Sequence, residues 1–201
     1  VTDESGAFTI QSFTIAVENT NDAPTISLPD SLTFAEDGFL TEDFSDYIED
    51  MDGDILLLTV SGNEELLVDI NGYMVTFTAP VNWNGTETLT FYVEDESGET
   101  AFDSVSVVVT PVNDTPTIDL PESFTFAEDG ILLDNFSQYI GDIDEDVLTL
   151  TASGMENIIV SIDGFQVMIG SVQDWNGSET VTFTVNDNQN RAIASDDVEV
   201  I

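Results

Sequence analysis

The feature that most constrains the fold is a tandem repetition with a spacing of 92 residues (116 minus 24). The segment Pro24-Thr25-Ile26 returns as Pro116-Thr117-Ile118, and Trp83-Asn84-Gly85 returns as Trp175-Asn176-Gly177. Just over half of the positions in 24–98 are identical to their counterparts in 116–190. Repetition at domain length predicts that each copy is one folded unit. We therefore expect domains at 23–115 and 116–201. Residues 1–22 match 93–114 and are expected to form the C-terminal hairpin and linker of a preceding repeat.

Within each copy the hydrophobic pattern has the period of a β-strand. Residues 88–93 and 104–107 alternate between polar and apolar side chains, which is typical of a strand with one buried face. Asp-Gly and Asn-Gly pairs interrupt the chain at intervals typical of turns. The expected strands of the first copy are 24–34, 39–47, 55–61, 66–70, 73–79, 86–94 and 100–110. Seven strands at this spacing predict an all-β fold of tandem immunoglobulin-like sandwiches, arranged head to tail.

An acidic motif recurs in both copies. Asp50, Asp52 and Asp54 alternate with other residues in the first copy, and Asp142, Asp144 and Asp146 do so in the second. Carboxylates held this close repel one another unless a cation lies among them. Ca²⁺ takes six to eight oxygen ligands of this kind. A solvated acidic turn would also explain one copy, but the recurrence favours calcium. The motif departs from an EF-hand, since Ile55 and Ser61 stand where that loop requires Gly and Glu.

Composition excludes several functional classes. The sequence has one basic residue and 41 Asp and Glu residues, which gives a net charge of −40. This charge repels other polyanions, so nucleic acid and anionic membranes are excluded as partners. The absence of cysteine and histidine excludes disulfides and the usual zinc ligands. No apolar run is long enough for a membrane span. Because the acidic residues recur evenly at turns, we expect no enzymatic activity.

These motifs together resemble the cadherin-like tandem repeats of large bacterial surface proteins. The resemblance is based on Asn-Asp-x-Pro at 21–24 and 113–116, Ala-Glu-Asp-Gly at 35–38, and the Asp-x-Asp motif. It implies a cadherin-like sandwich, calcium at the repeat junctions and an extracellular, cell-surface location. A cadherin Leu-Asp-Arg-Glu motif is missing, and 83–86 reads Trp-Asn-Gly-Thr instead.

The resemblance and the acidic motif together give a set of expected Ca²⁺ ligands. We expect linker residues and the glutamate of one repeat to converge with the aspartates of the next. The expected ligands are Asn21, Asp22, Glu36, Asp50, Asp52, Asp54, Asp95, Asn113, Asp114, Glu128, Asp142, Asp144, Asp146 and Asp187. The expected partners are adjacent repeats of the same chain, with head-to-tail self-association through residues 1–22 as a further expectation.

Two alternatives remain open from the sequence. Trp83 and Trp175 would stack on the sugars of a cell-surface polysaccharide if exposed, although a repeated Trp more often closes one end of a core. The acidic residues would also suit a protein from a saline environment, in which they hold hydrated salt rather than specific ions.

Overall fold

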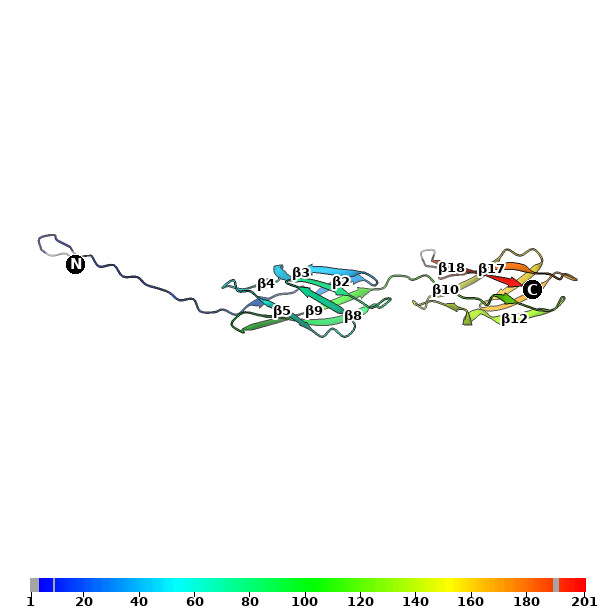
Figure 1. Ribbon diagram of the computed structural model, residues 1–201, viewed down its shortest axis with the longest axis horizontal. Helices are drawn as coiled ribbons and strands as arrows, with labels where there is room; N and C mark the ends of the chain where they lie inside the picture. The colour runs from blue at the N-terminus through cyan, green and yellow to red at the C-terminus, as the bar shows by residue number, and fades with distance from the viewer. Residues whose placement is uncertain (1–3, 9, 190–191) are drawn as a thin grey trace. The chain divides into compact units, whose positions relative to one another are not determined.

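The computed structural model describes residues 4–8, 10–189 and 192–201. The chain divides into two compact units, 1–110 and 111–201, and each is described by itself. Both units consist of β-strands with one short 3₁₀ helix each (Figure 1). The expected all-β class and a fold of two main sheets in each unit are confirmed. Within the described residues, no helix has the length and apolar character that crossing a membrane requires.

The first unit contains nine strands and one 3₁₀ helix. They are β1 (Thr25–Ile26), β2 (Ser31–Ala35), β3 (Phe39–Asp43), η1 (Phe44–Asp46), β4 (Ile48–Glu49), β5 (Leu57–Ser61), β6 (Leu67–Asn71), β7 (Met74–Thr78), β8 (Gly85–Glu94) and β9 (Thr100–Thr110). One sheet has the order β2-β9-β8-β5 and the other has the order β3-β7-β6, while β1 pairs with β4. The pairing of β2 with β9 is parallel, and the remaining pairings of this unit are antiparallel.

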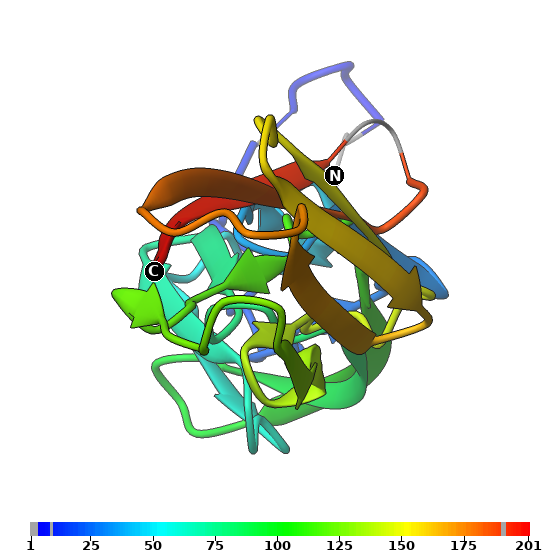
Figure 2. The same ribbon diagram turned by 90° about the vertical axis from the view of Figure 1, so that its right-hand side faces the viewer.

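The second unit repeats this topology. Its elements are β10 (Thr117–Ile118), β11 (Ser123–Phe124), β12 (Ile131–Asn135), η2 (Phe136–Gln138), β13 (Ile140–Gly141), β14 (Thr149–Ser153), β15 (Ile158–Asp163), β16 (Gln166–Ser171), β17 (Glu179–Asn186) and β18 (Ile193–Val200). The sheet orders are β11-β18-β17-β14 and β12-β16-β15. In Figure 2, where this unit faces the viewer, β17 and β18 lie side by side in orange and red.

Two expected strands and one expected hairpin are different in the structure. The segment 24–34 is divided into β1 and β2, because Pro29 has no backbone N–H for a ladder and the chain changes sheets there. The segment 39–47 is divided by η1, where the Asp43 carboxylate accepts from the Ser45 N–H (3.0 Å) and caps the helix. The expected hairpin within 1–22 is not formed in the described part of that segment, since residues 10–24 contain no strand. A lone hairpin is marginal in water. Neither sheet of the first unit pairs with residues 10–22, so nothing stabilises a hairpin there.

Each unit has its own aromatic core. Phe44, Phe77 and Phe91 are fully buried in the first unit, and the ring centroids of Phe44 and Phe91 lie 4.7 Å apart. In the second unit Phe136 and Phe183 have the same 4.7 Å separation. Burial of each such ring contributes about 1.5–3 kcal/mol. Because neither core borrows residues from the other, each unit has the basis for its own stability.

Candidate metal centre

The acidic loop of the first unit is folded around the side chain of Asp50. Its Oδ1 accepts the backbone N–H groups of Asp52 (2.9 Å) and Asp54 (3.2 Å), which curls the loop back on itself. Gly53 completes the loop with φ of +76°, a left-handed conformation that glycine adopts without steric cost. The other oxygen of Asp50, Oδ2, is buried and has no hydrogen-bond partner. A buried carboxylate oxygen without a partner is rare and indicates a missing ligand.

The linker residues before β1 contact this loop directly. The backbone N–H of Asp22 donates to Asp52 Oδ2 (2.6 Å), and the Asn21 amide donates to Asp95 Oδ2 (2.9 Å). Asp95 is only 5% exposed, and its Oδ1 accepts two backbone N–H groups of the loop that follows β8. The linker, the acidic loop and the β8–β9 loop therefore meet at one end of the first unit.

Electrostatics show that this end of the unit carries excess negative charge. The Asp22 N–H and the Asn19 amide lower the pKa of Asp52, and the Asn21 amide lowers the pKa of Asp95. The pKa of Asp54 is raised by desolvation and by the carboxylates around it, Asp50 first among them. The sequence of this unit contains no Lys, Arg or His, so no side chain of the unit can neutralise these groups. A bound cation would remove the repulsion that raises the pKa of Asp54.

The second unit repeats the hydrogen bonds of this loop, and its three aspartates lie closer together than those of the first loop. Asp142 Oδ1 accepts from the N–H groups of Asp144 (3.0 Å) and Asp146 (3.2 Å), and its buried Oδ2 has no partner. Ligand atoms of these three aspartates all lie within 4.8 Å of one another. Glu145 takes the position of Gly53 and keeps the left-handed conformation, with φ of +60°.

The linker contacts are also repeated in the second unit. The N–H of Asp114 donates to Asp144 Oδ2 (2.7 Å), and the Asn113 amide donates to Asp187 Oδ2 (2.8 Å). Asp187 is 1% exposed and has the role that Asp95 has in the first unit. Among the described residues of this site, the atoms that could bind a metal ion are carboxylate, side-chain amide and backbone oxygens. Hard divalent cations such as Ca²⁺ prefer oxygen ligands of this kind.

Glu36 and Glu128 are not part of these clusters. Glu36 follows β2, and its N–H donates to the Thr110 carbonyl at the C-terminal end of β9, whereas Asp95 adjoins the start of β9. The Glu36 carboxylate is buried and accepts from the Asn84 amide (3.3 Å). Glu128 has the corresponding position in the second unit and is exposed. The expected ligation of Glu36 together with residues of the following repeat stays a prediction.

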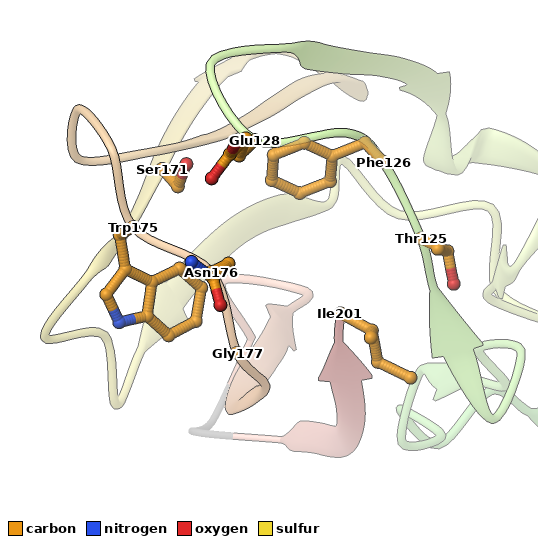
Figure 3. A pocket seen from close by; sticks show the side chains of 8 residues that line it. All are labelled: Thr125, Phe126, Glu128, Ser171, Trp175, Asn176, Gly177 and Ile201. Atoms are coloured by element: carbon orange, nitrogen blue, oxygen red, sulfur yellow. The ribbon is translucent and has the colours of Figure 1, made fainter.

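Both tryptophans are half-buried and pack against the cores of their units. Trp175 also lines a pocket of about 200 Å³ together with Phe126, Ser171 and Ile201 (Figure 3). We assign no ligand to this pocket.

The sequence analysis missed three residues of the first cluster. The Asn19 amide donates to Asp52, the Ser97 hydroxyl donates to Asn21 Oδ1 (2.9 Å), and Glu99 accepts from the Asn21 amide (3.2 Å). The expected ligands recur, with few exceptions, at the 92-residue spacing. Asn19 corresponds to Pro111 and Ser97 to Gln189, so repetition could not identify them. Their closeness to Asn21 and to Asp95 in the sequence was the available signal.

Comparison with known proteins supports the fold. A family model described as a bacterial Ig domain matches residues 21–110. Extracellular cadherin domains 3–6 of protocadherin gamma B2 superpose with a TM-score of 0.59 at 13% identity, covering 88% of this chain and 46% of that one. Domains EC1-2 of human mucin-like protocadherin superpose with a TM-score of 0.54 at 15% identity, covering 88% and 96%. These identities establish the fold alone.

A third comparison carries no argument about function. An endo-fucoidan hydrolase from glycoside hydrolase family 107 has a TM-score of 0.43 at 20% identity, covering 89% of this chain. The chain spans only 29% of the length of that hydrolase. Among curated proteins, no sequence matches this chain.

Proposed function

We propose that this chain, two tandem repeats of which residues 21–110 match a bacterial Ig domain model, is a calcium-binding structural segment of an extracellular surface protein. The observation that carries the proposal is the orphaned oxygen that occurs twice. Asp50 Oδ2 and Asp142 Oδ2 are both buried without a hydrogen-bond partner, each inside a cluster of carboxylates. Two independent copies of one uncompensated arrangement indicate a ligand rather than an accident of packing.

The residues of each cluster fit Ca²⁺. Asp50, Asp52, Asp54 and Asp95 would hold it in the first unit, and Asp142, Asp144, Asp146 and Asp187 in the second. Bound calcium would supply the positive charge that no side chain of the first unit can provide. Linker residues Asn21 and Asp22 already contact this cluster through hydrogen bonds. Calcium would stabilise those contacts by reducing the repulsion within the cluster, so that the path of the linker into each unit becomes fixed.

The biological role that follows is reach and stiffness in an adhesin or surface filament. A chain of such units extends a protein away from the cell surface when the linkers do not bend freely. The acidic residues act in this proposal as structural ligands, and the chain has no catalytic role. Recognition of a specific partner is then left to other surfaces of the protein.

Isothermal titration calorimetry of the chelator-stripped chain with CaCl₂ tests the proposal. We expect saturable binding of at least one ion per unit, with weaker binding of Mg²⁺, which demands a smaller octahedral site. An Asp50→Asn, Asp142→Asn double variant should lose most of the heat, because it removes the orphaned oxygens and keeps the turns. An absence of saturable heat at moderate salt would contradict the proposal and favour nonspecific salt binding.

Stiffness requires a separate measurement. Small-angle scattering with and without calcium should show a narrower distribution of distances in the calcium-bound chain. The double variant should give the broader distribution under both conditions. Identical profiles for the wild-type chain would mean that calcium does not control the linker.

A further inference from the structure

We propose that the outer face of the β2-β9-β8-β5 sheet is a binding platform for a neutral polysaccharide, centred on Tyr92 and Phe102. The two residues form a direct cross-strand pair between β8 and β9. Their ring centroids lie 5.8 Å apart with an angle of 39° between the ring planes. Tyr92 is 40% exposed and Phe102 is 68% exposed. Leu57, on the neighbouring strand β5, is 61% exposed. Three large apolar side chains therefore stand on a face that contributes nothing to the core.

The second unit shows that the fold does not need these side chains. In its β17–β18 pairing, Thr184 stands opposite Ser195 where Tyr92 stands opposite Phe102 in the first unit. The two hydroxyl groups are hydrogen bonded to each other at 2.8 Å. Thr149 has the position of Leu57. Since the same sheet forms with small polar residues there, the aromatic pair has a role other than folding.

The charge of this face also differs between the units, and the first unit has fewer acidic residues on it. Ser104 and Ser106 of β9 correspond to Asp197 and Glu199 of β18, as the strand registers show. Around the aromatic pair, the first unit thus has hydroxyl groups where the second has carboxylates. Glu94, paired with Leu57 at the end of the strands, is the acidic residue that borders the patch. In a chain with a net charge of −40, an uncharged aromatic face is a local exception.

The negative charge of the chain limits which partners this face can bind. An anionic polymer would be repelled by the net charge of −40, while an uncharged polymer meets no such barrier at this face. A second copy would bring another −40 charges. Three apolar side chains are also far from the roughly 800 Å² per partner that a stable protein interface buries. An uncharged ligand that contacts only a few side chains is therefore the occupant that the face fits.

The chemistry of the face suits sugar rings. The negative face of an aromatic ring attracts weakly positive hydrogens, such as the axial C–H groups on one face of a hexose. Thr90 and Ser104 form the next pair on the same face of these strands, two residues along from Tyr92 and Phe102, and their hydroxyl oxygens are 3.0 Å apart. They are placed to exchange their mutual hydrogen bond for bonds to sugar hydroxyls. Because the face is an open sheet surface, it would bind along an extended chain rather than at a chain end.

Affinity electrophoresis of the whole chain tests this proposal. The gels contain neutral polymers (laminarin, hydroxyethylcellulose, galactomannan or dextran), with alginate as the anionic comparison. We expect at least one neutral polymer to retard the wild-type chain and alginate to leave it unaffected. The Tyr92→Thr, Phe102→Ser double variant adopts the residue types of the second unit, so it should fold. Its apparent Kd should rise at least tenfold.

Two controls make the result specific. Phe39→Thr removes an aromatic ring that is 70% exposed on the other sheet, and it should leave retardation unchanged. The reciprocal variant Thr184→Tyr, Ser195→Phe should increase retardation. Each gel is repeated in EDTA, where binding should persist, so that failure of this proposal is separate from failure of calcium binding.

Two outcomes of the electrophoresis would overturn the inference. One is that no neutral polymer retards the wild-type chain, and the other is that the double variant retains its affinity. Sedimentation velocity tests for the other occupant. If the wild-type chain self-associates with concentration and the double variant does not, the face is an interface between copies instead.

Discussion

The sharpest test of the calcium site is Asp142→Asn, because its effect should change sign between EDTA and calcium. The new amide keeps an oxygen for the N–H groups of Asp144 and Asp146, which lie 3.0 and 3.2 Å from Asp142 Oδ1. It replaces the unpartnered Oδ2 with an NH₂ group that faces the neighbouring carboxylates. The loop should therefore keep its shape while losing one negative charge and one metal ligand.

In EDTA we expect the variant to be at least as stable as the wild type. Oxygen atoms of the three aspartates lie within 4.8 Å of one another. Two unit charges at that separation repel by about 0.9 kcal/mol in water, from 332/(80 × 4.8), and salt reduces this value further. Removing one charge relieves two such pairs. The gain in unfolding free energy should therefore be about 2 kcal/mol before screening, and roughly half of that at about 0.15 M salt, where the Debye length is about 8 Å.

In calcium the order should reverse. Extracellular calcium modules bind with Kd of about 0.1–1 mM, so about 10 mM calcium adds roughly 1.4–2.7 kcal/mol through RT ln(1 + [L]/Kd). The second unit has 91 residues (201 minus 110), for which each kcal/mol shifts Tm by about 4–8 °C. The wild-type transition of this unit should rise by roughly 6–20 °C, and the variant should lose most of that rise.

Differential scanning calorimetry with and without calcium measures both effects on one sample. The first unit, whose site is untouched, gives an internal reference transition. Asp163→Asn, at an exposed position at the end of β15, is the charge-matched control and should keep the full calcium response. A variant that keeps the wild-type calcium shift would refute the assignment of Asp142 as a ligand.

Three further predictions concern the units themselves. Glu145 has φ of +60°, so Glu145→Gly should stabilise the second unit by about 0.5–1 kcal/mol, and Gly53→Ala should cost the first unit a similar amount; urea titrations of both variants check this pair. Phe136 is fully buried, and Phe136→Ala should destabilise its unit by about 3–5 kcal/mol in the same assay while the transition of the first unit stays in place. Burial raises the pKa of Glu179, but backbone N–H donors outweigh it and lower the pKa overall, so this carboxylate contributes stability above about pH 4.3 that is lost as the pH falls through its folded-state pKa. Melting curves from pH 6 to pH 3 should show a shallower loss for Glu179→Gln than for the wild type, and parallel curves would contradict the prediction.

Repetition made most of the fold predictable. Residues that recur at one spacing mark both the unit length and the strands with a buried face, because the core tolerates only apolar side chains there. The strand breaks at Pro29 and at Asp43 were less visible. A proline and a helix cap affect only the backbone around them. Whether the chain passes from one sheet to the other depends on which partner strand lies nearby. Sequence periodicity carries no information about that partner.

The same reasoning applies to the site. Asp50, Asp52, Asp95 and the linker pair Asn21-Asp22 could be grouped in advance, since the loops that carry them fall at one end of a sandwich. The orphaned Oδ2 of Asp50 could not be predicted, because it depends on atomic burial. The Tyr92–Phe102 pair was also missed. It breaks the repetition, and a method that searches for shared residues overlooks what one copy has alone.

The parallel pairing of β2 with β9 has a mechanical consequence. The linker enters the first unit just before β1 and β2, and the chain leaves from the C-terminal end of β9. Tension between these two points pulls the paired strands lengthwise past each other. The load then falls on the whole Ser31–Ala35 ladder at once rather than opening one bond at a time. Under force in an optical trap, we therefore expect the first unit to yield in a single cooperative step.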